Sequence, residues 1–188
     1  MNTIRQTLLN KGYHLYTRPY ELNIAGIRNK TRRAGAFDDT IIVFYNDAHD
    51  AEQELHFAAT TDPGGYWLQH PMRTSGAAIL KSGQYVNAYQ IGMHRGKYLA
   101  LVQRGPVTVY RDNNHDLLTD LDERQTETGY FGINIHRALP QGMTQTVGRH
   151  SAGCQVFESA DNFSLFMGLC ERHRRLYGNS FTYTLVEE

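Results

Sequence analysis

The feature that most constrains the fold is a succession of short segments in which apolar and polar residues alternate between turn residues. Over residues 77–110 the alternation predicts three strands, with turns at 81–83, 94–96 and 104–106. The β-branched and aromatic run 40–45 is the clearest single strand, and residues 54–60 would pair with it. The pattern predicts a mainly β fold of the α+β class, an antiparallel sandwich or barrel.

Helices are expected near both ends of the chain. Residues 1–12 predict a short amphipathic helix, and 159–177 predict a longer C-terminal helix that stops at Gly178. Cys170 lies on the apolar stripe of that helix, which predicts a core residue. Residues 13–27 are strand-like, and 181–186 predict a closing strand. We expect one domain over residues 1–188, with 1–30 as a candidate N-terminal appendage.

The composition argues against several classes of protein. Lys and Arg together number 19, as do Asp and Glu, and this balance argues against a nucleic-acid partner. Two cysteines without a Cys-x-x-Cys motif argue against a disulfide scaffold. No run approaches the length of a membrane span, and the first ten residues lack the apolar core of a signal peptide. We therefore expect synthesis in the cytoplasm, without a membrane span.

A nucleophilic site is suggested by two short segments. Residues 131–136 alternate so that Asn134 and His136 share one strand face. Fourteen residues separate His136 from the segment Ser151-Ala-Gly-Cys154. A thiol attacks as thiolate and needs a nearby imidazole, and a turn at Gly153 could aim backbone N–H groups at an oxyanion. The alternative is an inert buried thiol and a structural strand histidine.

The pair His136 and Ser151-Ala-Gly-Cys154 resembles the signature of the L,D-transpeptidase family (YkuD type), in which a His precedes Ser/Thr-His-Gly-Cys at similar spacing. The resemblance implies an L,D-transpeptidase-like β sandwich or barrel, with its catalytic motif at residues 130–157. It implies that Cys154 is the nucleophile and His136 the base. It also implies an oxyanion hole at Gly153 and the Cys154 N–H, with Ser151 opening the motif and no cofactor.

The chain departs from the family pattern at two places. Ala152 replaces the second His of the motif, and the Arg or Asn that the family has shortly after the Cys is absent from residues 155–157. The Ser-x-Gly-Cys form also resembles divergent peptidoglycan-cleaving relatives, including secreted antibacterial effectors and phage-borne proteins. The implied partners are therefore stem peptides of bacterial peptidoglycan. We expect delivery to the wall through phage lysis or a secretion machine.

The implied chemistry leaves alternatives open. Attack by the thiol would form a thioester, which water would hydrolyse in a peptidase and an amine would capture in a transpeptidase. A non-catalytic wall-binding or virion structural module is the rival of another class. Asn134 or a backbone carbonyl near Arg137 could orient His136. Arg137 and Arg149 flank the motif and could meet a carboxylate of the stem peptide.

One segment has the residue spacing of a metal site. Residues 112–123 have the ligand spacing of a calcium loop, with Asp112, Asn114, Asp116, Asp120 and Glu123. Leu117 stands where such a loop needs glycine, which favours a polar turn rich in Asp and Asn over calcium. No His-Glu-x-x-His motif or closely spaced Cys/His pair points to zinc. The only Trp, Trp67, is expected in a loop, as a core anchor or a wall of a substrate groove.

Overall fold

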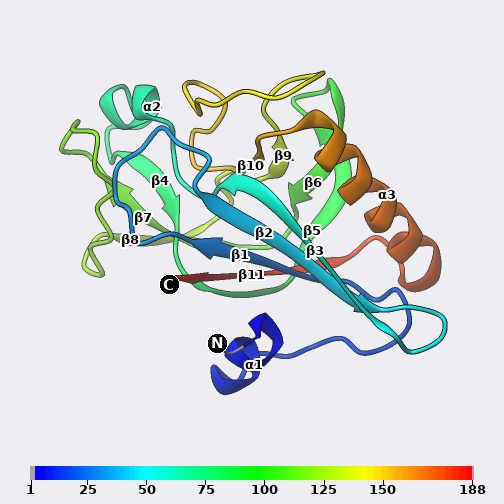
Figure 1. Cartoon of the computed structure of the whole chain (residues 1–188). Helices are drawn as coiled ribbons and strands as arrows, with labels where there is room; N and C mark the ends of the chain where they lie inside the picture. The colour runs from blue at the N-terminus through cyan, green and yellow to red at the C-terminus, as the bar shows by residue number, and fades with distance from the viewer. Residues whose placement is uncertain (1–2, 188) are drawn as a thin grey trace.

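Eight strands close into a barrel in the computed structural model, which describes residues 3–187 (Figure 1). Around the barrel the order is β1-β11-β5-β6-β9-β10-β3-β2. Its strands are β1 (Asn23–Arg28), β2 (Asp39–Asn46), β3 (Glu52–Thr60), β5 (Gly83–His94), β6 (Tyr98–Gln103), β9 (Ile135–Arg137), β10 (Gln155–Phe157) and β11 (Phe181–Glu187). The predicted mainly β fold is confirmed.

A second sheet of three strands lies beside the barrel, in the order β4-β7-β8. Its strands are β4 (Ala77–Leu80), β7 (Val107–Asp112) and β8 (Thr126–Gly129). Three helices complete the fold: α1 (Ile4–Asn10), α2 (Gly65–Gln69) and α3 (Ala160–Tyr177). Figure 1 shows α2 next to this second sheet and α3 on the opposite flank of the barrel. The helices expected near both ends of the chain are present.

The hairpin β2–β3 is the predicted pair of strands. It runs antiparallel from Asp39 opposite Ala59 to Asn46 opposite Glu52. The connecting turn is fixed by Asp47, whose Oδ1 accepts N–H groups at 2.8 and 3.1 Å. A carboxylate that bonds its own backbone in this way stabilises a tight turn without help from the core.

The barrel interior and α3 form one core. Inward side chains of the strands meet the apolar stripe of α3, which includes Phe163, Phe166 and Cys170. The Ser159 side chain caps the N-terminus of α3 by accepting the Asn162 N–H. Cys170 is 0% exposed, so the predicted core position is confirmed.

The N-terminal segment is attached to the barrel. The apolar face of α1 packs Ile4 and Leu8 against Ala25, Phe44 and other residues on the outside of β1 and β2. Strand β1 pairs with β2 on one side and β11 on the other. Residues 23–28 therefore belong to the barrel.

Four secondary-structure predictions made from short sequence patterns are wrong, because tertiary contacts determine the structure there. Residues 77–112 form four strands rather than three, because β4 and β7 pair in the second sheet. Of residues 13–27 only those from Asn23 onward form a strand. Trp67 lies in the short helix α2, not in a loop. Within residues 131–136 only the last two belong to β9, and Gly132 has a φ of 72°.

A polar network is buried within the barrel. Arg28 is 1% exposed, and its Nε lies 2.9 Å from Asp62 Oδ1. Its Nη2 donates to the Thr61 carbonyl at 3.0 Å, and Asp39 accepts the Thr61 N–H at 2.6 Å. Burial raises the pKa of Asp62 to about 6, against the opposing charge of Arg28. A buried cation of this kind requires its anionic partners, so the network ties β1 and β2 to the end of β3.

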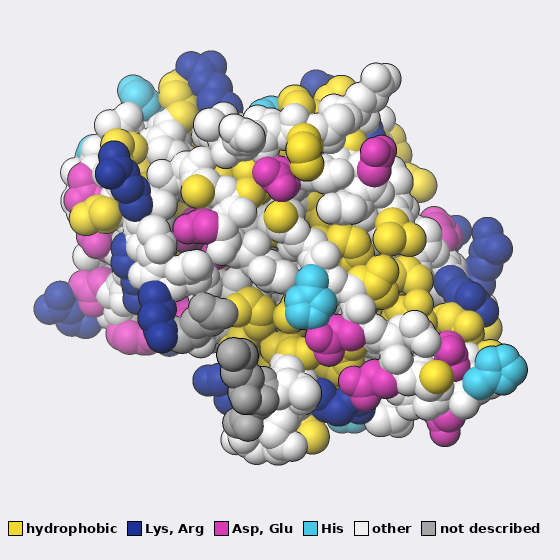
Figure 2. Space-filling view, in the orientation of Figure 1, with side chains coloured by type: hydrophobic (Ala, Val, Ile, Leu, Met, Phe, Trp, Pro, Cys, Tyr) yellow, Lys and Arg dark blue, Asp and Glu magenta, His cyan; other side chains and the backbone are white. Residues whose placement is uncertain are grey.

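The surface carries both signs of charge. On the face shown in Figure 2, Asp and Glu side chains lie among those of Lys and Arg. This distribution agrees with the equal numbers of acidic and basic residues in the chain. Over residues 3–187, none of the helices has the length and apolar character needed to traverse a bilayer.

Candidate active site

The nucleophile candidate, Cys154, ends a tight turn that leads into β10. The Ser151 hydroxyl donates to the Cys154 carbonyl at 2.8 Å and accepts the Gly153 N–H at 3.2 Å. Gly153 has a φ of 120°, and a Cβ there would lie 2.1 Å from the Ala78 carbonyl oxygen. Only glycine fits this position. Ser151 and Gly153 therefore shape the turn that presents the thiol.

The pairing of β9 with β10 brings the two predicted residues together. These strands are parallel, with Val156 opposite His136, and the Gln155 N–H donates to the Asn134 carbonyl at 2.9 Å. Alternation then places Cys154, Asn134 and His136 on the same face. The strand spacing and rise separate the Cα atoms of Cys154 and His136 by roughly 8 Å, within reach of both side chains.

Cys154 is a partly exposed residue, and its sulfur has two polar neighbours. The Asn134 N–H donates to Sγ at 3.4 Å, and the thiol donates to the Gly132 carbonyl at 3.4 Å. Burial raises the pKa of this thiol, opposed by the Asn134 N–H and the charge of Arg95. The resting group is therefore a thiol, not the thiolate that a lowered pKa would give.

The His136 ring is buried and held by a backbone carbonyl. Its Nδ1 lies 2.8 Å from the Arg137 carbonyl oxygen, which can only accept. The Tyr98 hydroxyl lies 3.3 Å from Nδ1 and donates to the same carbonyl at 3.2 Å. The proton of neutral His136 is therefore on Nδ1, and Nε2 is the basic nitrogen. The carbonyl of Arg137, rather than the Asn134 side chain, orients the ring.

The Asn134 side chain has other partners. Its Oδ1 accepts the Gln103 N–H at 2.9 Å, and its Nδ2 lies 3.0 Å from His94 Nδ1. Since Nδ2 can only donate, His94 Nδ1 accepts and the proton of His94 is on Nε2. Asn134 therefore joins β6 to a second histidine and contributes its backbone N–H to the thiol.

His94 is a site residue that the sequence did not predict. It ends β5, and its ring stacks on that of His136 with centroids 4.2 Å apart and planes at 27°. Burial lowers its pKa, and Arg95 adds to the effect. The sequence assigned this residue to a turn, and no local pattern connects it with Asn134, 40 residues away.

The electrostatics favour a neutral resting pair. Burial lowers the pKa of His136 to about 3, and His94, Arg95 and His150 add to the effect. The imidazole is therefore uncharged at neutral pH, and the thiol beside it keeps its proton. A preformed thiolate–imidazolium pair is therefore disfavoured, and any transfer of the thiol proton to His136 would have to occur during attack.

The expected oxyanion hole is only partly available. The Gly153 N–H donates to the Ser151 hydroxyl, so of the two predicted donors, Gly153 and Cys154, one is already in use. The Cys154 N–H has no hydrogen-bond acceptor within residues 3–187. Oxyanion stabilisation by the turn would therefore come from the Cys154 N–H.

Both predicted arginines lie on aromatic rings. The Arg137 guanidinium is 4.5 Å from the Tyr98 centroid, and its Nη1 donates to the Pro140 carbonyl at 3.1 Å. The Arg149 guanidinium lies 3.8 Å from the Tyr66 centroid. Neither forms an ion pair with an acidic side chain in the described part of the chain.

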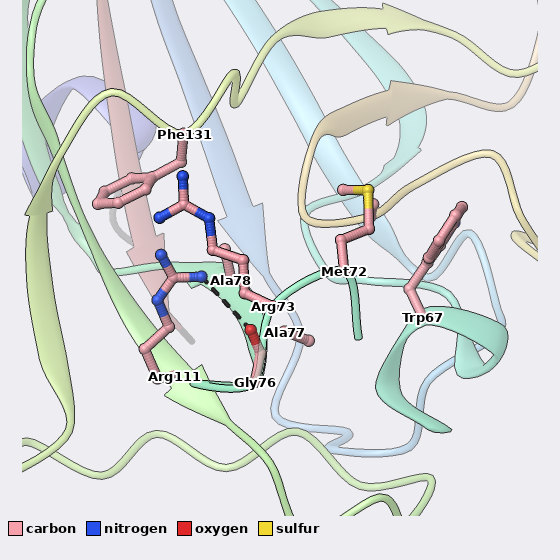
Figure 3. Close-up of a pocket in the computed structure, with 9 residues that line it drawn as sticks. Trp67, Met72, Arg73, Gly76, Ala77, Ala78, Arg111 and Phe131 are labelled. Atoms are coloured by element: carbon pink, nitrogen blue, oxygen red, sulfur yellow. Dashed lines mark hydrogen bonds between the residues drawn. The ribbon is translucent and has the colours of Figure 1, made fainter. Parts of the chain in front are cut away.

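A pocket adjoins the turn of the nucleophile (Figure 3). It has an empty volume of about 420 Å³, part of which opens to solvent. The residues that define it are Trp67, Met72, Arg73, Arg111, Phe131 and Ala152. Trp67 thus lines a groove, one of the two roles expected for it. Phe131, expected on the apolar face of a strand, lies at the pocket instead.

The loop considered for calcium is organised by its own backbone and side chains. The Asp116 and Leu118 N–H groups donate to the Asn114 and Asp116 side chains, as in an Asx-rich turn. Glu123 is bonded to Lys81 and Tyr110. Within residues 3–187, no three His, Cys, Asp or Glu side chains are grouped as metal ligands would be.

Comparison of the chain with protein-family models, with curated proteins and with solved structures found no match. The likeness to L,D-transpeptidases therefore depends on the residues His136 and Ser151–Cys154 and on the chemistry that their surroundings allow.

Proposed function

We propose that the protein is a cysteine-dependent, L,D-transpeptidase-like enzyme that cleaves stem peptides of bacterial peptidoglycan without a cofactor. The observation that carries the proposal is the parallel register of β9 and β10, from which we infer that Cys154, just before β10, shares a face with His136. It is supported by the Arg137 carbonyl on Nδ1, which leaves Nε2 as a base.

The first half of the reaction is acylation of the thiol. Sγ of Cys154 attacks an amide carbonyl carbon while Nε2 of His136 takes the thiol proton. The Cys154 N–H donates to the oxyanion, an interaction worth about a hundredfold or more in rate. The C–N bond then breaks, and His136 returns the proton to the leaving amine. A thioester and a free amine result.

The second half releases the acyl group. In the hydrolysis we propose, His136 takes a proton from water as the oxygen attacks the thioester carbon. The C–S bond breaks, the sulfur regains its proton, and a carboxylic acid leaves. If an amine of another stem peptide attacks instead, the product is a cross-link and the enzyme is a transpeptidase. Proton transfer by one positioned group contributes about 10²- to 10⁴-fold.

A non-catalytic wall-binding or virion structural module is the second candidate. It is favoured by the raised pKa of the Cys154 thiol and by Ala152 in place of the motif's second His. In that case the Cys154 thiol would have no catalytic role, and binding to the wall would not depend on it.

The test is digestion of purified sacculi and of defined tetrapeptide muropeptides, with products identified by mass spectrometry. Wild type, Cys154→Ala, His136→Ala and the matched control Cys170→Ala would be compared. We expect the wild type and Cys170→Ala to release terminal D-alanine or open cross-links. Cys154→Ala should be inactive, and His136→Ala should lose about 10²- to 10⁴-fold.

Other outcomes decide between the alternatives. Exchange of the terminal residue for an added D-amino acid would establish a transpeptidase. The wall-binding alternative predicts no product from the wild type, together with equal sedimentation of wild type and Cys154→Ala on sacculi. Equal activity of Cys154→Ala and wild type would refute thiol catalysis.

A further inference from the structure

We propose that the pocket next to Cys154 is a carboxylate-binding subsite, in which Arg111 and Arg73 select peptides bearing a free carboxylate beside the bond to be cleaved. The proposal rests on the proposed function for the identity of the peptide. The subsite itself follows from the position, charge and shape of the pocket.

The pocket is lined by residues from the two segments that meet at the thiol, although Cys154 itself does not line it. Ala152 is two residues before Cys154 in the tight turn. Phe131 precedes Gly132, whose carbonyl accepts from the thiol at 3.4 Å. In the sequence, Phe131 precedes and His136 follows the two residues that contact the thiol, Gly132 and Asn134. We infer that a peptide bound across the sulfur would have the imidazole on one side and the pocket on the other.

The pocket carries an excess positive charge. Arg111 is 8% exposed, and its Nε donates to Glu127 Oε2 at 2.7 Å. Arg73 Nη1 lies 3.9 Å from the other oxygen of the same carboxylate. Two guanidinium groups thus share one carboxylate, and Glu127 is itself partly exposed. A buried arginine is stabilised by full pairing, so a second carboxylate would be attracted to this position.

The Arg111 guanidinium has hydrogen-bonding capacity left. Its Nη1 donates to the Gly76 carbonyl at 3.4 Å, the dashed contact in Figure 3. Its Nη2 lies 2.6 Å from Glu127 Oε2 but has no well-directed hydrogen-bond acceptor within the described chain. A planar guanidinium whose Nη2 is poorly aligned with its present partner is well suited to a further carboxylate.

The shape of the pocket suits one amino-acid residue with an acidic group. Figure 3 shows Arg73, Arg111 and Phe131 gathered on one side, with Met72 and Trp67 across from them. The guanidinium carbons of Arg111 and Arg73 lie 4.8 and 6.0 Å from the Phe131 centroid, so the ring holds both cations in place.

Ala152 links this subsite to the unusual motif. Its small side chain lines the pocket, so a histidine at this position would occupy space that is now open. The chain also lacks the Arg or Asn that the resembled family has after the Cys. Arg111 and Arg73 supply positive charge on the pocket side instead. Arg137 and Arg149, which the sequence suggested for this role, lie against Tyr98 and Tyr66.

The binding test uses the fluorescence of Trp67, which is the only Trp in the chain and lines the pocket. Folded Cys154→Ala protein would be titrated with a stem tetrapeptide whose diamino acid has a free carboxylate, and with the same peptide carrying a carboxamide there. We expect the acid to bind about tenfold or more tightly than the amide. Arg73→Gln and Arg111→Gln, each combined with Cys154→Ala, should bind both peptides with similar affinity.

Controls separate charge recognition from loss of structure. Arg124→Gln removes an exposed arginine that is paired only with Asp122, and it should keep the preference for the acid. Arg111 is buried and its replacement could disturb the second sheet, whereas Arg73 is largely exposed and its replacement leaves the fold intact. Equal affinity of Cys154→Ala for acid and amide, or an unchanged preference in Arg73→Gln and Arg111→Gln, would overturn the proposal.

The same peptides distinguish this proposal from the proposed function. Tighter binding of the acid without any thiol-dependent cleavage would support the carboxylate subsite and refute the proposed enzymatic activity. Thiol-dependent cleavage of acid and amide at equal kcat/KM would support the proposed enzymatic activity and refute the carboxylate subsite. If both proposals hold, the acid is cleaved with the higher kcat/KM, and Arg73→Gln removes most of the difference.

Discussion

The two cysteines of the chain lie in regions that differ in exposure and in the polarity of their neighbours. Cys170 lies in α3 among core side chains such as Phe163 and Phe166, with no exposed surface. Cys154 ends a loop turn at the barrel surface, where the Asn134 N–H and the Gly132 carbonyl meet its sulfur. Burial raises the pKa of both thiols, most strongly that of Cys170.

The comparison shows that a perturbed pKa alone does not identify a reactive thiol. A thiol reacts when a reagent can approach its sulfur and when a base can take its proton. Cys154 meets the first condition through its partial exposure, and His136, as the proposed base, would meet the second. Cys170 meets neither, because its neighbours are apolar and it has no contact with solvent.

The largest expected difference is in alkylation of the folded protein. Iodoacetamide should label one thiol in the wild type, and Cys154→Ser should reduce labelling to background. Cys170→Ser should leave it unchanged, because the remaining thiol is the accessible one. Intact-mass spectrometry before and after unfolding in guanidinium would count the labelled sites. Labelling of folded Cys154→Ser at the wild-type rate would break the contrast.

The next effect is the pH dependence of that labelling. The raised pKa of Cys154 means that the thiolate fraction at neutral pH is below that of a free cysteine. The alkylation rate should therefore rise by about tenfold per pH unit between pH 6 and 8, without a plateau. Stopped-time labelling with mass detection would measure it. A plateau at neutral pH would instead show a thiolate paired with protonated His136.

The smallest effect concerns stability. Cys170→Ala removes a fully buried sulfur from the core and should lower the free energy of unfolding by about 1 kcal/mol. Cys154→Ala, at the partly exposed turn, should change it by less than about half of that. Urea denaturation followed by circular dichroism would compare the two variants. A larger loss for Cys154→Ala would mean that its thiol is chiefly structural.

The parts of the site that are local in sequence could be predicted. Alternation placed Asn134 and His136 on one face, and the Ser151–Cys154 turn was evident from its glycine. The helical stripe of 159–177 identified Cys170 as a core residue, as the structure confirms. In each case the information lies within a few residues, where strand and helix periods act.

The rest depends on barrel closure, which no local pattern encodes. His94 comes from β5 and Tyr98 from β6, and they meet His136 only because β9 pairs with β6 in a particular register. Arg111 reaches the pocket from the second sheet. The sequence likewise could not show that Ser151 would engage the Gly153 N–H, because that depends on the shape of the finished turn.

The close approach of Gly153 to the Ala78 carbonyl packs β4 of the second sheet against the turn that carries the nucleophile. Strand β4 bears directly on the backbone that carries Cys154, with no side chain between them to absorb a displacement. A substitution that adds a Cβ at residue 153 must therefore displace either β4 or the turn that carries Cys154.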